Sequence, residues 1–212
     1  MSDFIALPPR PRLAMDGSEL RFPVRRIFCI GRNYADHAAE MGEKAEALFF
    51  MKPAEAVTQA DVVPFPKATE NLHHEVEMVV ALGDGGKPVA AGIGIDLTRR
   101  DVQSRMKDRR APWETAKAFE GSAPIGLLKA GPPPASGRIT LRVNGEIRQD
   151  GDLSQMLLGL EDILDALGTN FEPGPGDLVF TGTPAGVSAV KPGDRIEAHI
   201  DGLPPLSLTF GE

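Results

Sequence analysis

The chain has 212 residues, of which 42% are hydrophobic and 25% are charged. This is the composition of a globular protein with one sizeable core, and it excludes a disordered chain. The formal net charge of −7 argues against a nucleic-acid partner, because binding to a phosphate backbone requires a basic surface. An anionic small molecule would therefore need a local cation in its binding site.

Cysteine usage and hydropathy indicate a cytoplasmic protein. The single cysteine, Cys29, allows no intramolecular disulfide and suits a reducing compartment, where we expect it to be a small buried hydrophobic residue. The N-terminal segment has prolines where a signal peptide has its apolar core. No apolar run reaches the roughly 18 residues that a membrane-spanning helix requires. We therefore expect no membrane partner.

The first quarter of the chain predicts short elements. Residues 1–24 form a proline-rich lead-in, with an edge hairpin around Asp16-Gly17. A strand is expected over residues 26–30. A short helix follows from Asp36, a candidate N-cap, to Gly42, a candidate C-cap, and residues 43–47 read as a loop. The next strand, over residues 48–52, ends at Pro53.

Strands dominate the rest of the chain as well. In chain order we expect strands over residues 74–83 and 90–98, a charged surface helix over 99–110, a hairpin over 139–151 that turns at Asn144-Gly145, an amphipathic helix over 153–168, a strand that enters a glycine-rich loop over 177–187, and a terminal hairpin over 194–210. The 23 glycines and 19 prolines are spread along the chain, which suits many short strands joined by turns. The pattern lacks a regular βαβ alternation, so it predicts an α+β, sheet-rich single domain over residues 25–212.

Three carboxylates occupy unusual positions in this pattern. Glu75 and Glu77 stand in an apolar strand and point to the same side, because side chains alternate along a strand. Asp96 ends the next apolar strand. Two like charges in an apolar setting require basic partners or a metal ion. An all-oxygen set favours Mg²⁺, Mn²⁺ or Ca²⁺ over Zn²⁺. A solvated strand face is the alternative, and His73 and His74 are either further ligands or an exposed strand start.

A second candidate group lies in GRNYADHAAEMG. His37 and Glu40 are three residues apart and share a face of the predicted helix. A carboxylate that holds one ring nitrogen leaves the other nitrogen free to act as a base toward water. The alternative is an exposed ion pair that contributes little.

Polar residues after Asp96 form a third group. Arg100 and Gln103 share a helix face, and Lys117 follows; together they can hold an anionic substrate, although a solvated charged helix explains Arg100 as well. The loop FTGTPAGV can offer backbone N–H groups or the Thr183 hydroxyl to a carboxylate, or it is only a tight turn.

Together, these residues resemble a known family. The motifs IGRNYADHAAEMG, FFMKP, HHEVEMVVALG, GIDLTRRDVQ, AKAFEGSAPIG, LRVNGEIRQDG and PGDLVFTGTPAGV occur in the order typical of the fumarylacetoacetate hydrolase superfamily. The resemblance covers the chain from about Arg25 onward. Its compact form is most similar to the bacterial fumarylpyruvate hydrolases, with acylpyruvate hydrolases and oxaloacetate decarboxylases as near neighbours.

The resemblance implies a mixed β-sandwich or β-roll with few short helices, a Mg²⁺ or Mn²⁺ cofactor, a small anionic 2-oxo or diketo acid substrate and a homodimer. The roles that it implies are as follows: Glu75, Glu77 and Asp96 bind the metal; His37, Glu40 and Lys117 are catalytic, with the His–Glu pair on a lid; Arg32, Tyr34, Arg100, Gln103 and Thr183 bind substrate. The longer members also have an N-terminal domain and a fourth acidic ligand, for which this sequence has no clear counterpart.

The activity expected from these parts is metal-dependent hydrolysis of a C–C bond in a 2,4-diketo acid such as fumarylpyruvate. Decarboxylation of oxaloacetate on the same site is the first alternative, because it needs the same enolate but no attacking water. A 2-oxo acid hydratase is a further alternative. A structural metal-binding β-protein without catalysis is the alternative from another class.

Overall fold

Two large sheets form the body of the protein. The computed structural model describes residues 4–6, 8–40 and 47–212. The six-stranded sheet runs in the order β12 (Lys129–Ala130), β9 (Pro88–Ile95), β8 (Val76–Leu82), β15 (Asp177–Phe180), β3 (Arg26–Gly31) and β4 (Leu48–Lys52). The five-stranded sheet runs in the order β14 (Glu146–Asp152), β13 (Arg138–Val143), β17 (Arg195–Ile200), β18 (Leu206–Phe210) and β6 (Val62–Val63).

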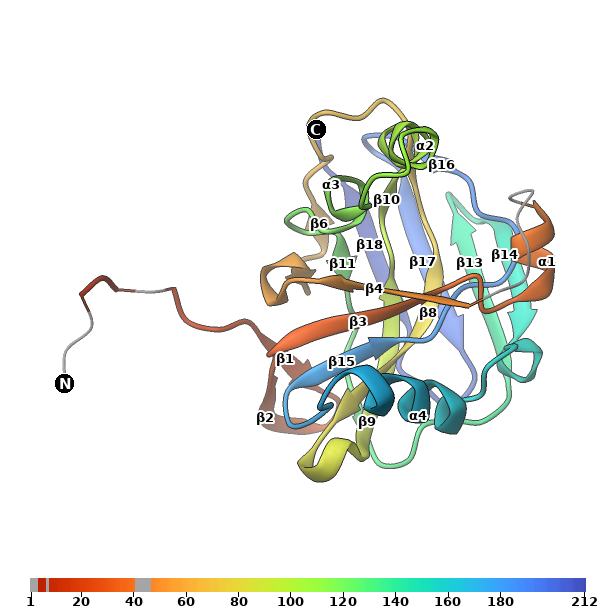
Figure 1. Cartoon of the computed structure of the whole chain (residues 1–212). Helices are drawn as coiled ribbons and strands as arrows, with labels where there is room; N and C mark the ends of the chain where they lie inside the picture. Colours follow the sequence, from red (N-terminus) through yellow and green to blue (C-terminus); the bar gives the residue numbers. More distant parts are fainter. Residues whose placement is uncertain (1–3, 7, 41–46) are drawn as a thin grey trace.

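Smaller elements surround these sheets (Figure 1). The small sheets pair β1 (Arg12–Met15) with β2 (Ser18–Pro23), β7 (Leu72–His73) with both β10 (Thr98–Arg99) and β16 (Ala189–Val190), and β11 (Ala123–Pro124) with β5 (Val57–Thr58). The helices of the described residues are α1 (Ala35–Glu40), α2 (Arg100–Asp108), α3 (Glu114–Lys117) and α4 (Leu160–Asn170), and the 3-10 turns are η1 (Ala54–Ala56), η2 (Asp84–Gly86) and η3 (Leu153–Gln155). The predicted sheet-rich α+β fold with few short helices is confirmed.

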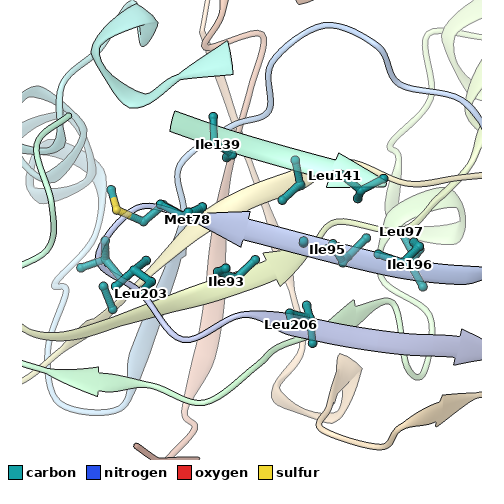
Figure 2. Close-up of a cluster of buried hydrophobic side chains, with 14 of the residues drawn as sticks. Met78, Ile93, Ile95, Leu97, Ile139, Leu141, Ile196, Leu203 and Leu206 are labelled. Carbon is teal, nitrogen blue, oxygen red and sulfur yellow. The ribbon is translucent and has the colours of Figure 1, made fainter. Parts of the chain in front are cut away.

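The main core lies between the two large sheets. Met78 and Ile93 from the six-stranded sheet face Ile139, Leu141 and Ile196 from the five-stranded sheet (Figure 2). The opposite face of β8 is also buried, because Val79 belongs to a second apolar cluster. A strand buried on both faces explains the continuous apolar run of β8. It also means that a charged side chain in this strand enters the interior of the protein.

The predicted hairpins are confirmed. β13 and β14 pair around Asn144 and Gly145, whose φ angles of 52° and 85° are those of a type I′ turn. The N-terminal hairpin pairs β1 with β2, and Gly17 has a φ of 63°. Cys29 is fully buried, as expected, and burial raises the pKa of its thiol.

The prediction of one helix over residues 153–168 is wrong. η3 covers the first turn, and α4 begins only at Leu160. The backbone between them is bonded to Asn33 instead: Leu157 N–H donates to the Asn33 carbonyl, and Leu158 N–H donates to Asn33 Oδ1, each at 2.8 Å. Asn33 is fully buried and also donates to the Leu158 carbonyl. These tertiary bonds replace the i to i−4 bonds that a continuous helix would need.

Two further predictions concern helices. The helix expected from Asp36 is present as α1, but it begins at Ala35, so Asp36 lies in its first turn and the N-cap prediction is wrong. The expected end at Gly42 and residues 43–46 of the loop expected over 43–47 lie outside the described residues. The charged helix over 99–110 is confirmed as α2, but its face with Arg100, Val102 and Gln103 is buried. No helix in the described part of the chain has the length and apolar character needed to cross a membrane.

Candidate active site

Three buried carboxylates meet at one end of the β8–β9 pair. Glu75 immediately precedes β8, Glu77 lies in it, and Asp96 immediately follows β9. The antiparallel register pairs Glu77 with Gly94, and Asp96 N–H donates to the Glu75 carbonyl at 2.8 Å. One oxygen from each carboxylate lies within 4.8 Å of the others, and the three residues are 5%, 2% and 1% exposed. The alternative of a solvated strand face is therefore wrong.

Basic side chains compensate two of the three carboxylates. Lys117 Nζ lies 2.7 Å from Glu75 Oε2 and 2.6 Å from Asp96 Oδ2. Arg100 donates to Glu75 Oε1. Burial alone would raise the pKa of the Glu75 carboxyl, but Lys117 and Arg100 hold that pKa well below its usual value. Glu75 is therefore ionised despite its burial.

Glu77 has a different environment. Its carboxylate accepts a hydrogen bond from Gly182 N–H at 2.6 Å. Within the described part of the chain, no lysine or arginine forms an ion pair with it. Burial, followed by the charges of Asp96 and Glu75, raises the pKa of Glu77 well above its usual value. A buried carboxylate in this state requires either a proton or an additional cation.

Lys52 leaves one oxygen of Asp96 without a hydrogen bond. This fully buried ammonium donates to three backbone carbonyls, those of Leu97, Lys117 and Ser122. Its three hydrogens are thereby used, so its 2.8 Å contact with Asp96 Oδ1 is an ion pair without a hydrogen bond. Asp96 Oδ1, which accepts no hydrogen bond, and the uncompensated Glu77 contribute to an all-oxygen donor set that fits a hard divalent cation such as Mg²⁺ or Mn²⁺.

The predicted His37–Glu40 pair is present on α1 but is not hydrogen-bonded. His37 Nδ1 lies 3.6 Å from Glu40 Oε2, and this buried nitrogen has no hydrogen-bond partner among the described residues. The Glu40 carboxylate accepts instead from Gly186 N–H, at 3.0 and 3.2 Å. Glu40 therefore joins α1 to the loop after β15. Burial lowers the pKa of His37, which favours the neutral imidazole.

The residues predicted to bind substrate are distributed unevenly around this centre. Arg100 donates to Gln103 Oε1 at 2.7 Å, so the predicted shared face is confirmed and touches Glu75. The Tyr34 hydroxyl is buried without a hydrogen bond to any described residue, and burial, followed by the charge of Glu77, raises its pKa. Arg32, in contrast, is half-buried, and its guanidinium carbon lies 6.0 Å from the Trp113 ring centroid.

Thr183 lies in a buried polar network that the sequence did not reveal. Gln149 Nε2 donates to Thr183 Oγ1 at 2.8 Å, and Gln149 Oε1 lies 2.9 Å from His74 Nδ1. His74 is fully buried, so the expectation of an exposed strand start is wrong for this residue. Gln149 and Lys52 were missed because an isolated Gln in a hairpin or Lys before a proline has no local pattern. Full burial of such a residue is visible only in the fold.

Surface cavities do not identify the site by their size. A cavity of about 480 Å³ lies among Gln59, Leu127 and Leu206, and none of the three carboxylates lines it. A smaller cavity of about 190 Å³ is lined by Tyr34 and Asp36 on one side and by Pro184 and Ala185 on the other. This second cavity separates the start of α1 from the loop after β15. The smaller cavity adjoins residues of the candidate site, whereas the larger one does not. The buried charged side chains therefore locate the site better than cavity volume does.

Comparison with known proteins identifies the family. The family described as "Fumarylacetoacetate (FAA) hydrolase C-terminal" matches residues 26–210, and the chain belongs to this family of enzymes. Among solved structures, the fumarylpyruvate hydrolase from Pseudomonas aeruginosa in complex with Mn²⁺ and pyruvate is 40% identical, has a TM-score of 0.95 and aligns over 99% of both chains.

Curated relatives point to a second activity. The mitochondrial oxaloacetate tautomerase FAHD1 of Rattus norvegicus is 40% identical over 202 residues, which cover 88% of this chain and 90% of the relative. The oxaloacetate tautomerase YcgM of Escherichia coli is 36% identical over 203 residues, which cover 88% and 93%. Family membership sets aside the alternative of a structural protein without catalysis. The relatives divide between two reactions of small 2-oxo acids.

Proposed function

We propose that this protein is a divalent-metal-dependent hydrolase that cleaves a C–C bond in a 2,4-diketo acid of the fumarylpyruvate type, giving fumarate and pyruvate. The observation that carries the proposal is the buried triad Glu75, Glu77 and Asp96 together with a buried His37 imidazole, which is close enough to interact electrostatically with Glu75 and whose Nδ1 has no hydrogen-bond partner among the described residues. The similarity to a fumarylpyruvate hydrolase over nearly the whole chain supports it.

The charges around the triad suit a dianionic substrate. Three carboxylates are matched by three cationic side chains, Lys52, Arg100 and Lys117. Glu75, Glu77 and Asp96 would hold the Mg²⁺ or Mn²⁺ ion, which would supply Lewis acidity toward the 2-oxo group and its enolate. The added charge of the divalent ion would leave the site positive. Such a site can bind a small dianion even though the whole protein has a net charge of −7.

The residues of the chain would then carry out hydrolysis in the following steps. His37, whose Nδ1 faces Glu40, accepts a proton from water at Nε2, and the water oxygen bonds to C4 of the diketo acid. The C3–C4 bond breaks and its electron pair enters the pyruvate enolate, which Lys117 and Arg100 stabilise by their charge. The His37 imidazolium then returns its proton to C3, which completes pyruvate and restores the base. Arg32, Tyr34, Gln103 and Thr183 are proposed to hold the carboxylate and acyl ends.

Tautomerisation of oxaloacetate is the second candidate, because both mammalian and bacterial relatives have this activity in their names. It moves one proton between C3 and the enol oxygen and requires no attacking water. The same metal ligands and the same base suffice for it. Decarboxylation of oxaloacetate would give the same pyruvate enolate as the proposed hydrolysis.

One experiment separates these candidates. Purified protein with Mg²⁺ or Mn²⁺ is given fumarylpyruvate, a simple acylpyruvate or oxaloacetate, and loss of enol absorbance is followed together with the products. Formation of fumarate and pyruvate, abolished by EDTA, supports the hydrolase. Enol–keto conversion of oxaloacetate without any C–C cleavage would move the assignment to the tautomerase, and release of CO₂ would move it to the decarboxylase.

His37→Ala tests the proposed base. Hydrolysis is expected to fall by about 10²–10⁴-fold, the usual contribution of a general base. Mn²⁺ affinity, measured by calorimetry, should not change, because His37 is not among the proposed ligands. Undiminished hydrolysis by the purified variant would remove His37 from the mechanism.

The homodimer and the cytoplasmic location remain predictions, which light scattering and cell fractionation would test.

A further inference from the structure

The buried amide of Gln149 has only one orientation that its neighbours allow. Its Oε1 accepts from Val76 N–H at 3.1 Å, and its Nε2 donates to the Pro184 carbonyl at 2.8 Å. A backbone N–H can only donate and a carbonyl can only accept, so exchanging the two ends of the amide would break both bonds. The direction of every other hydrogen bond in this network follows from that fixed amide.

Both amide hydrogens of Gln149 are used, one for Pro184 and one for Thr183 Oγ1 at 2.8 Å. The Thr183 hydroxyl is therefore an acceptor toward Gln149, and its own hydrogen must point elsewhere. Among the described residues, none accepts a hydrogen bond from this hydroxyl. Thr183 is 3% exposed, so it keeps one free donor in a buried place.

The other end of the amide extends the network. Gln149 Oε1 is an acceptor, so His74 Nδ1, 2.9 Å away, must carry a hydrogen. His74 Nε2 lies 2.9 Å from Ser188 Oγ. Ser188, His74 and Gln149 thus form a chain of hydrogen bonds that ends at Thr183. His74 and Gln149 are both fully buried, so this chain of hydrogen bonds lies in the interior of the protein.

The free donor lies next to the metal-ligand triad. Gly182, the residue before Thr183, bonds through its N–H to Glu77, and Val76, which bonds to Gln149, lies between Glu75 and Glu77. We infer that Gln149, held by His74, is a positioning residue that forces the Thr183 hydroxyl to act only as a donor, toward an anionic oxygen of the bound 2-oxo acid. This inference rests on the proposed function and goes beyond it by assigning roles to Gln149 and His74.

Gln149→Glu reverses the polarity with little change in shape. A carboxylate oxygen in place of the amide nitrogen would accept from the Thr183 hydroxyl and draw its hydrogen away from the substrate. The probe is pyruvate in the presence of MnCl₂, with Kd measured by calorimetry for wild type, Gln149→Glu, Thr183→Val and the double variant. Mn²⁺ affinity and thermal unfolding are measured alongside. Gln59→Glu is the matched control, since Gln59 bonds to two backbone groups but does not contact the triad.

The expected results form a thermodynamic cycle. Thr183→Val and Gln149→Glu should each weaken pyruvate binding by about tenfold or more, the usual loss for a hydrogen bond to a charged group. The double variant should bind within about twofold of Thr183→Val, because Gln149 acts through Thr183. Mn²⁺ affinity should be unchanged, and Gln59→Glu should bind pyruvate like wild type. Thr183→Ser, which keeps the donor, should remain close to wild type.

Three results would count against the inference. An equal penalty for Gln149→Glu in the wild-type and Thr183→Val backgrounds would show that its added charge, and not Thr183, is responsible. Unchanged binding by Thr183→Val would overturn the inference even if Gln149→Glu does not fold. Wild-type protein that binds neither Mn²⁺ nor pyruvate would overturn the proposed function itself, and this inference with it.

Discussion

Among single residues, Glu77 most directly links the stability of the fold to the proposed metal binding. In the unfolded chain the Glu77 carboxyl has the usual pKa of 4.5, and in the folded protein burial raises this pKa well above that value. Between the two values the folded state holds a proton that the unfolded state has lost. The contribution of Glu77 to stability is therefore present at low pH and lost as pH rises above about 4.5 in the metal-free protein.

Glu77→Gln should remove this pH dependence. In EDTA, the difference in unfolding free energy between the variant and wild type should grow in favour of the variant as pH rises from about 5 to 8. The same substitution should weaken Mn²⁺ binding, since one of the three proposed ligands would lose its negative charge. Urea unfolding at several pH values and calorimetry with Mn²⁺ measure the two effects. A variant with the same pH profile as wild type would contradict the assignment of the raised pKa to Glu77.

Lys52 is a second residue whose burial makes a definite prediction. Lys52→Met removes a hydrogen bond from three backbone carbonyls, although that of Ser122 keeps the Leu97 N–H as a donor, and it deprives Asp96 of its 2.8 Å cation contact. Removing one partner of a buried ion pair typically destabilises by about 3–5 kcal/mol, because the other charge stays buried. Lys129→Met is the control: this exposed lysine donates to one carbonyl, and its loss should change stability by less than about 0.5 kcal/mol. Urea unfolding of both variants tests the difference, and equal losses would refute it.

For individual elements, the accuracy of the sequence-based predictions depends on whether the residues that determine the element are close to it or distant from it in the sequence. The 139–151 hairpin was predictable because Asn144 and Gly145 impose their turn locally. The break between η3 and α4 was not, because Asn33, which is 125 positions from Leu158 in sequence, binds that backbone. The site shows the same division. Glu75, Glu77 and Asp96 are conspicuous within apolar strands, whereas Gln149 and Lys52 acquire their roles only from distant partners.

The loop after β15 positions three features of the site at once: it carries Thr183, bonds to Glu77 and holds α1 through Gly186. Gly186 has a φ of 95°, and a Cβ at this position would come within 1.8 Å of the Arg148 carbonyl oxygen. An alanine there would therefore have to displace the loop. The bond between Gly186 N–H and Glu40 would be lost with it.

Gly186→Ala should consequently affect catalysis as well as stability. Displacement of α1 and of the loop by about an ångström can reduce turnover by about 100-fold. Gly193→Ala is a matched control, because Gly193 has a φ of 85° but no atom within 4 Å of the point that a Cβ would occupy. It should lose only about 1–2 kcal/mol, the cost of an L-residue at positive φ, with turnover preserved. Kinetics and thermal unfolding of both variants test this, and equal loss of turnover would refute the role of the close approach.

At the scale of the whole molecule, the core and the candidate site are separate sources of stability. Leu141 is fully buried on β13 in the core between the sheets (Figure 2), whereas the triad lies at one end of the β8–β9 pair. Side chains that share no partners usually contribute additively to stability. Metal binding to the folded protein alone adds to this, by about 2.7 kcal/mol when the free ion is at about 100 times its Kd.

Leu141→Ala should therefore lower the free energy of unfolding by about 2–5 kcal/mol, the usual loss for a cavity in a core, and leave the stabilisation by Mn²⁺ unchanged. Ile147→Ala is the control, because Ile147 lies on the neighbouring strand but is 43% exposed, and it should lose much less. Unfolding of wild type and both variants, with Mn²⁺ and with EDTA, gives the two contributions separately. A site preformed by the six-stranded sheet should retain its geometry when the opposite sheet loses one side chain. A smaller stabilisation by Mn²⁺ in Leu141→Ala than in wild type would instead show that the core and the site are energetically coupled.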